Sequence, residues 1–147
     1  MTDVPSTIRV LVAEDNALER STLVDLLNAL GHMVVAEVAS GAEAIEHARQ
    51  LTPDAVLLDV HMPGASGVEA AEEIAHALPG TAVVLITGDL SLTLSSADVL
   101  RSTAVALPAK PTPPTTLDAT LRMAVMRARE LLAAKRGSLH LAHHEVM

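Results

Sequence analysis

The sequence contains no Phe, Tyr or Trp and no Cys. Without aromatic rings the chain has no platform on which unpaired bases could stack, which argues against a binder of single-stranded nucleic acid. Without cysteine it can form neither disulfides nor thiolate metal sites. It also lacks an apolar run of about 18 residues and a basic-then-apolar leader, so we expect a cytoplasmic protein that does not enter a membrane.

The formal net charge is -8, and it is unevenly distributed. Residues 1–100 hold three Arg and no Lys against fifteen acidic residues, whereas residues 101–147 hold seven basic residues against three acidic ones. A basic C-terminal segment can dock an acidic partner, although a solvated helix face is the commoner explanation. Too few residues follow Arg136 for a helix-turn-helix domain, so we expect no binding of nucleic acid.

Short apolar runs typical of buried strands alternate with segments of helical periodicity. The expected strands are Ile8–Ala13, Met33–Val38, Ala55–Leu58, Ala82–Ile86 and Ala104–Leu107. Ser40 with Glu43, and Ser66 with Glu69, have the spacing of an N-terminal capping box, which predicts a helix after each serine.

The first, fourth and last helices lack a capping box, and other residues indicate where they lie. Gly31 is a natural stop for the first helix. The period-two pattern of Leu90–Leu94, taken alone, indicates a strand, but the alternation of strands and helices around it predicts a short or irregular helix there. The last helix should run to about Arg136, end at Gly137 and leave 137–147 as a flexible tail. The apolar stripe of this helix is Leu117, Leu121, Ala124, Val125, Ala128, Leu131 and Leu132. We also interpret its two methionines, Met123 and Met126, as packing residues.

Five β-α units with buried strands predict a doubly wound α/β domain with a parallel sheet that is covered on both faces. We expect the flavodoxin-like (βα)5 fold with strand order 2-1-3-4-5. We expect one domain over residues 1–136, with a core of about 7–133, and no output domain in this chain.

Polar residues follow the strands that this order makes contiguous: Glu14 and Asp15, then Asp59, Thr87 and Lys110. Three carboxylates at one end of a sheet repel one another unless a cation joins them, and oxygen ligands with open positions suit Mg²⁺. The amine of Lys110 and the hydroxyl of Thr87 suit anionic oxygens. The set is therefore typical of phosphoryl transfer, with an Asp59 oxygen as the nucleophile that forms an acyl phosphate.

Four segments, "VLVAEDN", "AVLLDVHMPGASGVEA", "LITG" and "LPAKP", resemble in order and spacing the receiver domain of bacterial two-component response regulators, here of the single-domain type. The resemblance covers about residues 7–133. It implies that Asp59 accepts a phosphoryl group from a sensor histidine kinase or a histidine phosphotransfer protein, and that Thr87 and Lys110 contact it. Such a chain is a signalling phosphoacceptor and not an enzyme that turns over a separate substrate.

The resemblance also implies a metal site for Mg²⁺, with Mn²⁺ as a substitute. Asp15 and Asp59 would bind the ion directly, Glu14 largely through water, and His61 through its backbone carbonyl. The switching surface would comprise the fourth helix, the fifth strand and the fifth helix, through which a homodimer could also form. The downstream partner is not identified.

Three alternatives remain open. Glu14 and Asp15 could merely cap the first helix together with Asn16. Leu107 occupies the position where the family usually has Tyr or Phe, so the chain could be a scaffold whose binding ignores phosphorylation. A phosphate-ester hydrolase with an aspartyl-phosphate intermediate would need a second aspartate two residues after the nucleophile, where this sequence has His61.

Overall fold

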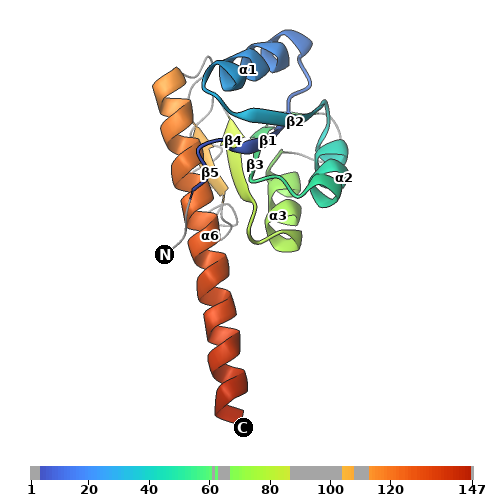
Figure 1. Cartoon of the computed structure of the whole chain (residues 1–147). Helices are drawn as coiled ribbons and strands as arrows, with labels where there is room; N and C mark the ends of the chain where they lie inside the picture. Colours follow the sequence, from blue (N-terminus) through green and yellow to red (C-terminus); the bar gives the residue numbers. More distant parts are fainter. Residues whose placement is uncertain (1–3, 61, 63–66, 87–103, 108–112, 147) are drawn as a thin grey trace.

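The computed structural model describes residues 4–60, 62, 67–86, 104–107 and 113–146, with side chains for all of these except 104–107 and 135–146. Helix and strand labels follow Figure 1. The helix expected around Leu90–Leu94, and the capping role of Ser66, lie outside the described residues.

Five parallel strands form one sheet in the order β2-β1-β3-β4-β5 (Figure 1). The strands are β1 (Arg9–Ala13), β2 (Met33–Val38), β3 (Ala55–Asp59), β4 (Ala82–Ile86) and β5 (Ala104–Leu107). This is the expected flavodoxin-like strand order, and three of the five strands have the expected bounds. The five-fold β-α repeat itself is described for every unit except the fourth, whose helix would lie between β4 and β5.

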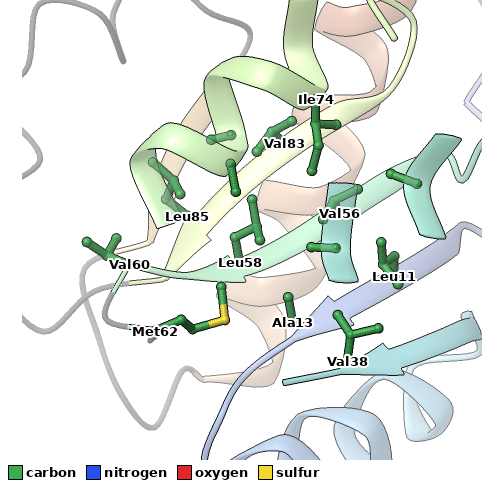
Figure 2. Close-up of a cluster of buried hydrophobic side chains, with 14 residues drawn as sticks. Leu11, Ala13, Val38, Val56, Leu58, Val60, Met62, Ile74, Val83 and Leu85 are labelled. Carbon is green, nitrogen blue, oxygen red and sulfur yellow. The ribbon is translucent and has the colours of Figure 1, made fainter. Parts of the chain in front are cut away.

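Alternate residues of the central strands enter two separate cores. On one face of the sheet, side chains of β1, β3 and β4 pack against α2 (Gly41–Leu51) and α3 (Gly67–Ala77). Figure 2 shows this cluster, in which the labelled residues include Val56, Leu58, Val83, Leu85 and Ile74. On the other face, intervening residues such as Val12, Leu57 and Val84 pack against α1 (Ala17–Ala29) and α6 (Pro114–Val146). The two-residue period of a strand therefore buries both faces of this sheet.

Local sequence signals set the ends of α1 and α2. The N–H of Glu43 donates to Ser40 Oγ at 3.2 Å, and Ser40 Oγ donates to Glu43 Oε1 at 3.0 Å, so the predicted cap is confirmed. Thr52 ends α2 in a left-handed conformation with φ 41°, one residue before a proline. Gly31 has φ +85° just after α1, as its predicted role as a helix stop requires.

Helix α6 differs from expectation in two respects. It continues through Gly137 to Val146, so the predicted end of the helix at Arg136 is wrong, while the flexibility expected of residues 137–147 stays a prediction. A glycine inside a helix costs only about 1 kcal/mol relative to alanine, which the helix-forming residues around it offset. Met123 and Met126 are 65% and 41% exposed, so their interpretation as packing residues is also wrong. The buried stripe of the helix lies on its opposite side.

Two arginines of α6 bind acidic residues of the same chain. Arg129 Nη2 donates to Asp54 Oδ1 at 3.0 Å, and Arg122 Nε donates to Asp118 Oδ2 at 3.1 Å. Asp118 also lies 2.7 Å from Nε2 of the buried His32. The hydrogen bond from His32 holds the pKa of Asp118 below its ordinary value of 3.8, against the opposing effect of burial and with a further contribution from Arg122. Part of the basic charge of the C-terminal segment thus secures α6 to the domain.

Candidate metal centre

Two adjacent strands bring the acidic residues together. β1 and β3 are parallel, and Ala13 pairs with Leu58. The next residue of each strand is therefore at the same level along the sheet: Glu14, just past the end of β1, and Asp59, the last residue of β3. Because parallel strands end at one edge, the register alone places these two carboxylates side by side.

Glu14, Asp15 and Asp59 form one cluster, as the sequence predicted. One carboxylate oxygen from each lies within 4.8 Å of the others. Glu14 is fully buried, Asp59 is 5% exposed, and Asp15 faces solvent. The cluster is therefore open on the Asp15 side and closed on the side of the sheet.

The chemistry of this donor set fits a hard divalent cation. Two like charges about 4 Å apart repel by about 4 kcal/mol at an effective dielectric constant of 20. A divalent cation between them attracts both, so the net electrostatic energy of the three charges is favourable. Carboxylate oxygens are ligands of Mg²⁺, which usually takes one or two of them and keeps several waters. Asp15 is the solvent-exposed member of the cluster, so water reaches the carboxylates from its side.

The backbone around the cluster is held independently of any ion. The N–H of Glu14 donates to the Val38 carbonyl oxygen at 3.0 Å, which ties the segment after β1 to β2. Asn16 caps α1, because its side chain accepts from the N–H of Glu19 at 3.0 Å. The capping alternative is thus correct for Asn16, while Glu14 and Asp15 direct carboxylate oxygens to the cluster.

Gly67, at the start of α3, allows the backbone after β3 to approach the helix closely. A Cβ at this position would lie 2.3 Å from the Asp59 carbonyl oxygen and 2.6 Å from the Val60 Cα. The N–H of Gly67 donates to the Val60 carbonyl oxygen at 3.1 Å. Any side chain here would displace the segment that carries Asp59. The sequence offered only a glycine in a turn-rich stretch, with no sign of which backbone it would contact.

Comparison with known protein families matches residues 10–122 to the response regulator receiver domain. The chain belongs to the response regulator receiver family. The match covers most of the sequence and includes all three acidic residues of the cluster.

Relatives and solved structures agree with this assignment. The receiver is 37% identical over 129 residues to the transcriptional regulatory protein PdtaR of Mycobacterium tuberculosis, covering 85% of this chain and 60% of PdtaR. It is 35% identical over 77 residues to the chemotaxis protein CheY of Thermotoga maritima, covering 52% of this chain and 64% of CheY. The receiver thus spans less than two thirds of these relatives.

The fold similarity extends over most of the receiver. The signal receiver domain of NarL from Mycobacterium tuberculosis superposes with a TM-score of 0.69 at 31% identity, covering 82% of this chain and 98% of that one. A receiver domain protein from Clostridium thermocellum gives a TM-score of 0.74 at 25% identity, covering 84% and 98% of the two chains.

Three predicted site residues of the receiver, His61, Thr87 and Lys110, lie outside the described residues, so their roles remain predictions. Among the described helices, none combines the length and hydropathy that a membrane span requires.

Proposed function

We propose that this receiver accepts a phosphoryl group on Asp59 in a reaction that depends on Mg²⁺, as one step of a two-component phosphorelay. The observation that carries the proposal is the convergence of Glu14, Asp15 and Asp59 within 4.8 Å at the carboxyl edge of the sheet. Membership of the receiver family supports the same reaction class.

Asp59 is suited to act as the nucleophile. It is the last residue of a buried strand that pairs with β1 as far as Leu58, and Asp59 itself pairs with Ile86 of β4, so its backbone is held in the sheet. A carboxylate oxygen would attack the phosphorus of a phosphohistidine, form a new O–P bond and break the N–P bond. The imidazole leaves with the electron pair and takes up a proton. Positioning and charge compensation are the main contributions that a protein makes to such a transfer.

Asp15 and Asp59 would hold Mg²⁺ directly, Glu14 largely through water, and the backbone carbonyl of His61 would complete the protein ligands. When bound, Mg²⁺, or Mn²⁺ in its place, supplies positive charge to the oxygens of the phosphoryl group. The burial of Glu14 keeps one carboxylate in a fixed place, while the exposure of Asp15 leaves the phosphodonor an open approach.

Thr87 and Lys110 complete the proposal as the hydroxyl and the amine that contact the phosphoryl oxygens. The phosphodonor would be a sensor histidine kinase or a histidine phosphotransfer protein. Phosphorylation would then change the surface made by the helix before β5, by β5 and by α6, through which a second copy could also bind. A cytoplasmic location and a receiver domain that ends near residue 136 remain part of this proposal.

The proposal is tested by incubating the purified chain with a small phosphodonor, such as acetyl phosphate, and Mg²⁺, then measuring the intact mass. We expect a gain of one phosphoryl group that is labile to base, is absent when a chelator replaces Mg²⁺, and is lost in D59N. The matched control is D25N, which makes the same chemical change at an exposed residue of α1. A D59N variant that gained the same mass as wild type would contradict the proposal.

A further inference from the structure

Arg20 links α1 to the segment that carries two of the acidic residues. Its Nη1 donates to the Glu14 carbonyl oxygen at 2.8 Å in a partly buried hydrogen bond. Its Nε lies 3.8 Å from Glu37 Oε1, at the far end of β2. The N–H of Glu14 is already bound to the same strand through Val38. Both polar groups of the Glu14 backbone are therefore held, one by β2 and the other by Arg20.

The contact fixes more than Glu14. A peptide unit is planar, so the carbonyl of Glu14 and the N–H and Cα of Asp15 move as one rigid group. Holding the Glu14 oxygen therefore restrains the Asp15 Cα, the point from which the Asp15 side chain leaves the backbone, and leaves only rotation about its N–Cα bond to turn that side chain. Glu14 is fully buried and is restrained by its surroundings, whereas Asp15 is exposed and depends on its backbone for its position.

We propose that Arg20 is a positioning residue for Asp15, and that its hydrogen bond to the Glu14 carbonyl sets the affinity of the acidic cluster for Mg²⁺. This inference rests on the metal site of the proposed function. Groups that orient metal ligands from outside the ligand shell commonly change affinity by about tenfold or more when they are removed.

The charge of Arg20 alone would act in the opposite direction. A guanidinium close to a divalent-cation site repels the cation, so simple removal of the charge should strengthen Mg²⁺ binding. The side chains of Arg20 and Glu37 are 23% and 49% exposed, so solvent screens both charges and the effect of either charge alone on the cluster is small. The two explanations thus predict shifts of opposite sign on substitution of Arg20, and this makes the inference testable.

The experiment measures Mg²⁺ binding to the full chain by isothermal titration calorimetry, with no phosphodonor present. We expect R20A to bind Mg²⁺ about tenfold more weakly than wild type, and R20K, whose amine can still donate to the Glu14 carbonyl, to recover most of the affinity. E37Q, which removes the ion pair and leaves the hydrogen bond, should bind like wild type. The matched control is R49A, because Arg49 forms an exposed 3.4 Å ion pair with Glu73 between α2 and α3, on the other face of the sheet.

Thermal unfolding of each variant separates positioning from general stability. A purely structural role would lower the unfolding temperature of R20A and leave its Mg²⁺ affinity unchanged well below the transition. An R20A variant that bound Mg²⁺ as tightly as wild type, or more tightly, would overturn the inference about Arg20. The metal site itself would still stand in that case if D59N bound Mg²⁺ more weakly than wild type. If wild type and D59N bound Mg²⁺ equally poorly, the proposed metal site would fail and this inference with it.

Discussion

Substitution of Gly67 by alanine tests how closely the start of α3 must approach the strand that carries Asp59. The added Cβ would lie 2.3 Å from the Asp59 carbonyl oxygen, whereas ordinary contact begins at 3.4 Å, so one of the two backbones must move by about 1 Å. Overpacking of this kind costs typically 1–3 kcal/mol. The higher helix propensity of alanine returns at most about 1 kcal/mol, so we expect a net loss of about 1–2 kcal/mol.

The same displacement should affect the reaction more than the stability. A shift of about 1 Å at a reacting group can cost about a hundredfold in rate, and here the clash is with the backbone of Asp59 itself. We therefore expect G67A to remain folded and to be phosphorylated far more slowly than wild type. Stability is best followed by far-ultraviolet circular dichroism in urea, because the chain has no Trp or Tyr to serve as a fluorescent probe.

Gly80 provides the matched control. Its added Cβ would lie 2.7 Å from Leu132 Cδ2, the far end of a flexible side chain that can rotate away. We expect G80A to change stability by no more than about 0.5 kcal/mol and to be phosphorylated at the wild-type rate. If G67A matched wild type in both urea midpoint and phosphorylation rate, the close approach of α3 to β3 would have no functional consequence and the reasoning would be refuted.

Two further predictions concern stability away from the acidic cluster. The variant D118N loses the carboxylate that binds His32 and Arg122, so we expect it to be less stable than wild type at neutral pH. The pKa of Asp118 is lowered from 3.8 in the folded state. The contribution of this carboxylate to the free energy of unfolding is therefore fully present above 3.8 and is lost as pH falls through the folded pKa. Urea titrations should therefore show a difference in the free energy of unfolding between wild type and D118N that is constant at about pH 5–7 and disappears below about pH 4. A difference that grows in acid would contradict this prediction. In S40A, α2 loses the oxygen that accepts from the Glu43 N–H, so we expect a loss of about 1 kcal/mol and a decrease of about 3 °C in melting temperature, and an unchanged melting curve would show that the cap contributes nothing.

The sheet could be predicted from sequence because its strands are short, mostly apolar runs separated by segments of helical periodicity. Met33–Val38, Ala82–Ile86 and Ala104–Leu107 have the predicted bounds. The third strand was predicted to end at Leu58, yet Asp59 pairs with Ile86 and completes it. The charge of Asp59 suggested a residue beyond the strand. Its side chain belongs to the acidic cluster, while its backbone still pairs with β4 as part of the sheet.

The helices show where local signals are insufficient. Gly31 and Gly137 look alike in the sequence, but only Gly31 has a positive φ and ends a helix. Met123 and Met126 are apolar, but they lie opposite the face that Leu121 and Val125 bury against the sheet. Whether a residue packs depends on its angle around the helix and on what the helix faces, which composition alone does not supply.

The acidic cluster could be predicted because strand order converts sequence positions into neighbours. Glu14, Asp15 and Asp59 needed only the pairing of β1 with β3 to be brought together. Arg20 and Gly67 could not be found in this way, because their roles consist of contacts with backbone atoms of Glu14 and Asp59. Backbone contacts of this kind leave no residue pattern in the sequence.

The most direct test of the central claim is to locate the phosphoryl group on the chain. After phosphorylation in the presence of Mg²⁺, reduction with borohydride converts an aspartyl phosphate to homoserine, and peptide fragmentation identifies the modified position. We expect modification at residue 59, none at the exposed Asp15 or Asp25, and none when Mg²⁺ is chelated. Modification at any other residue, or an equal yield without Mg²⁺, would contradict it.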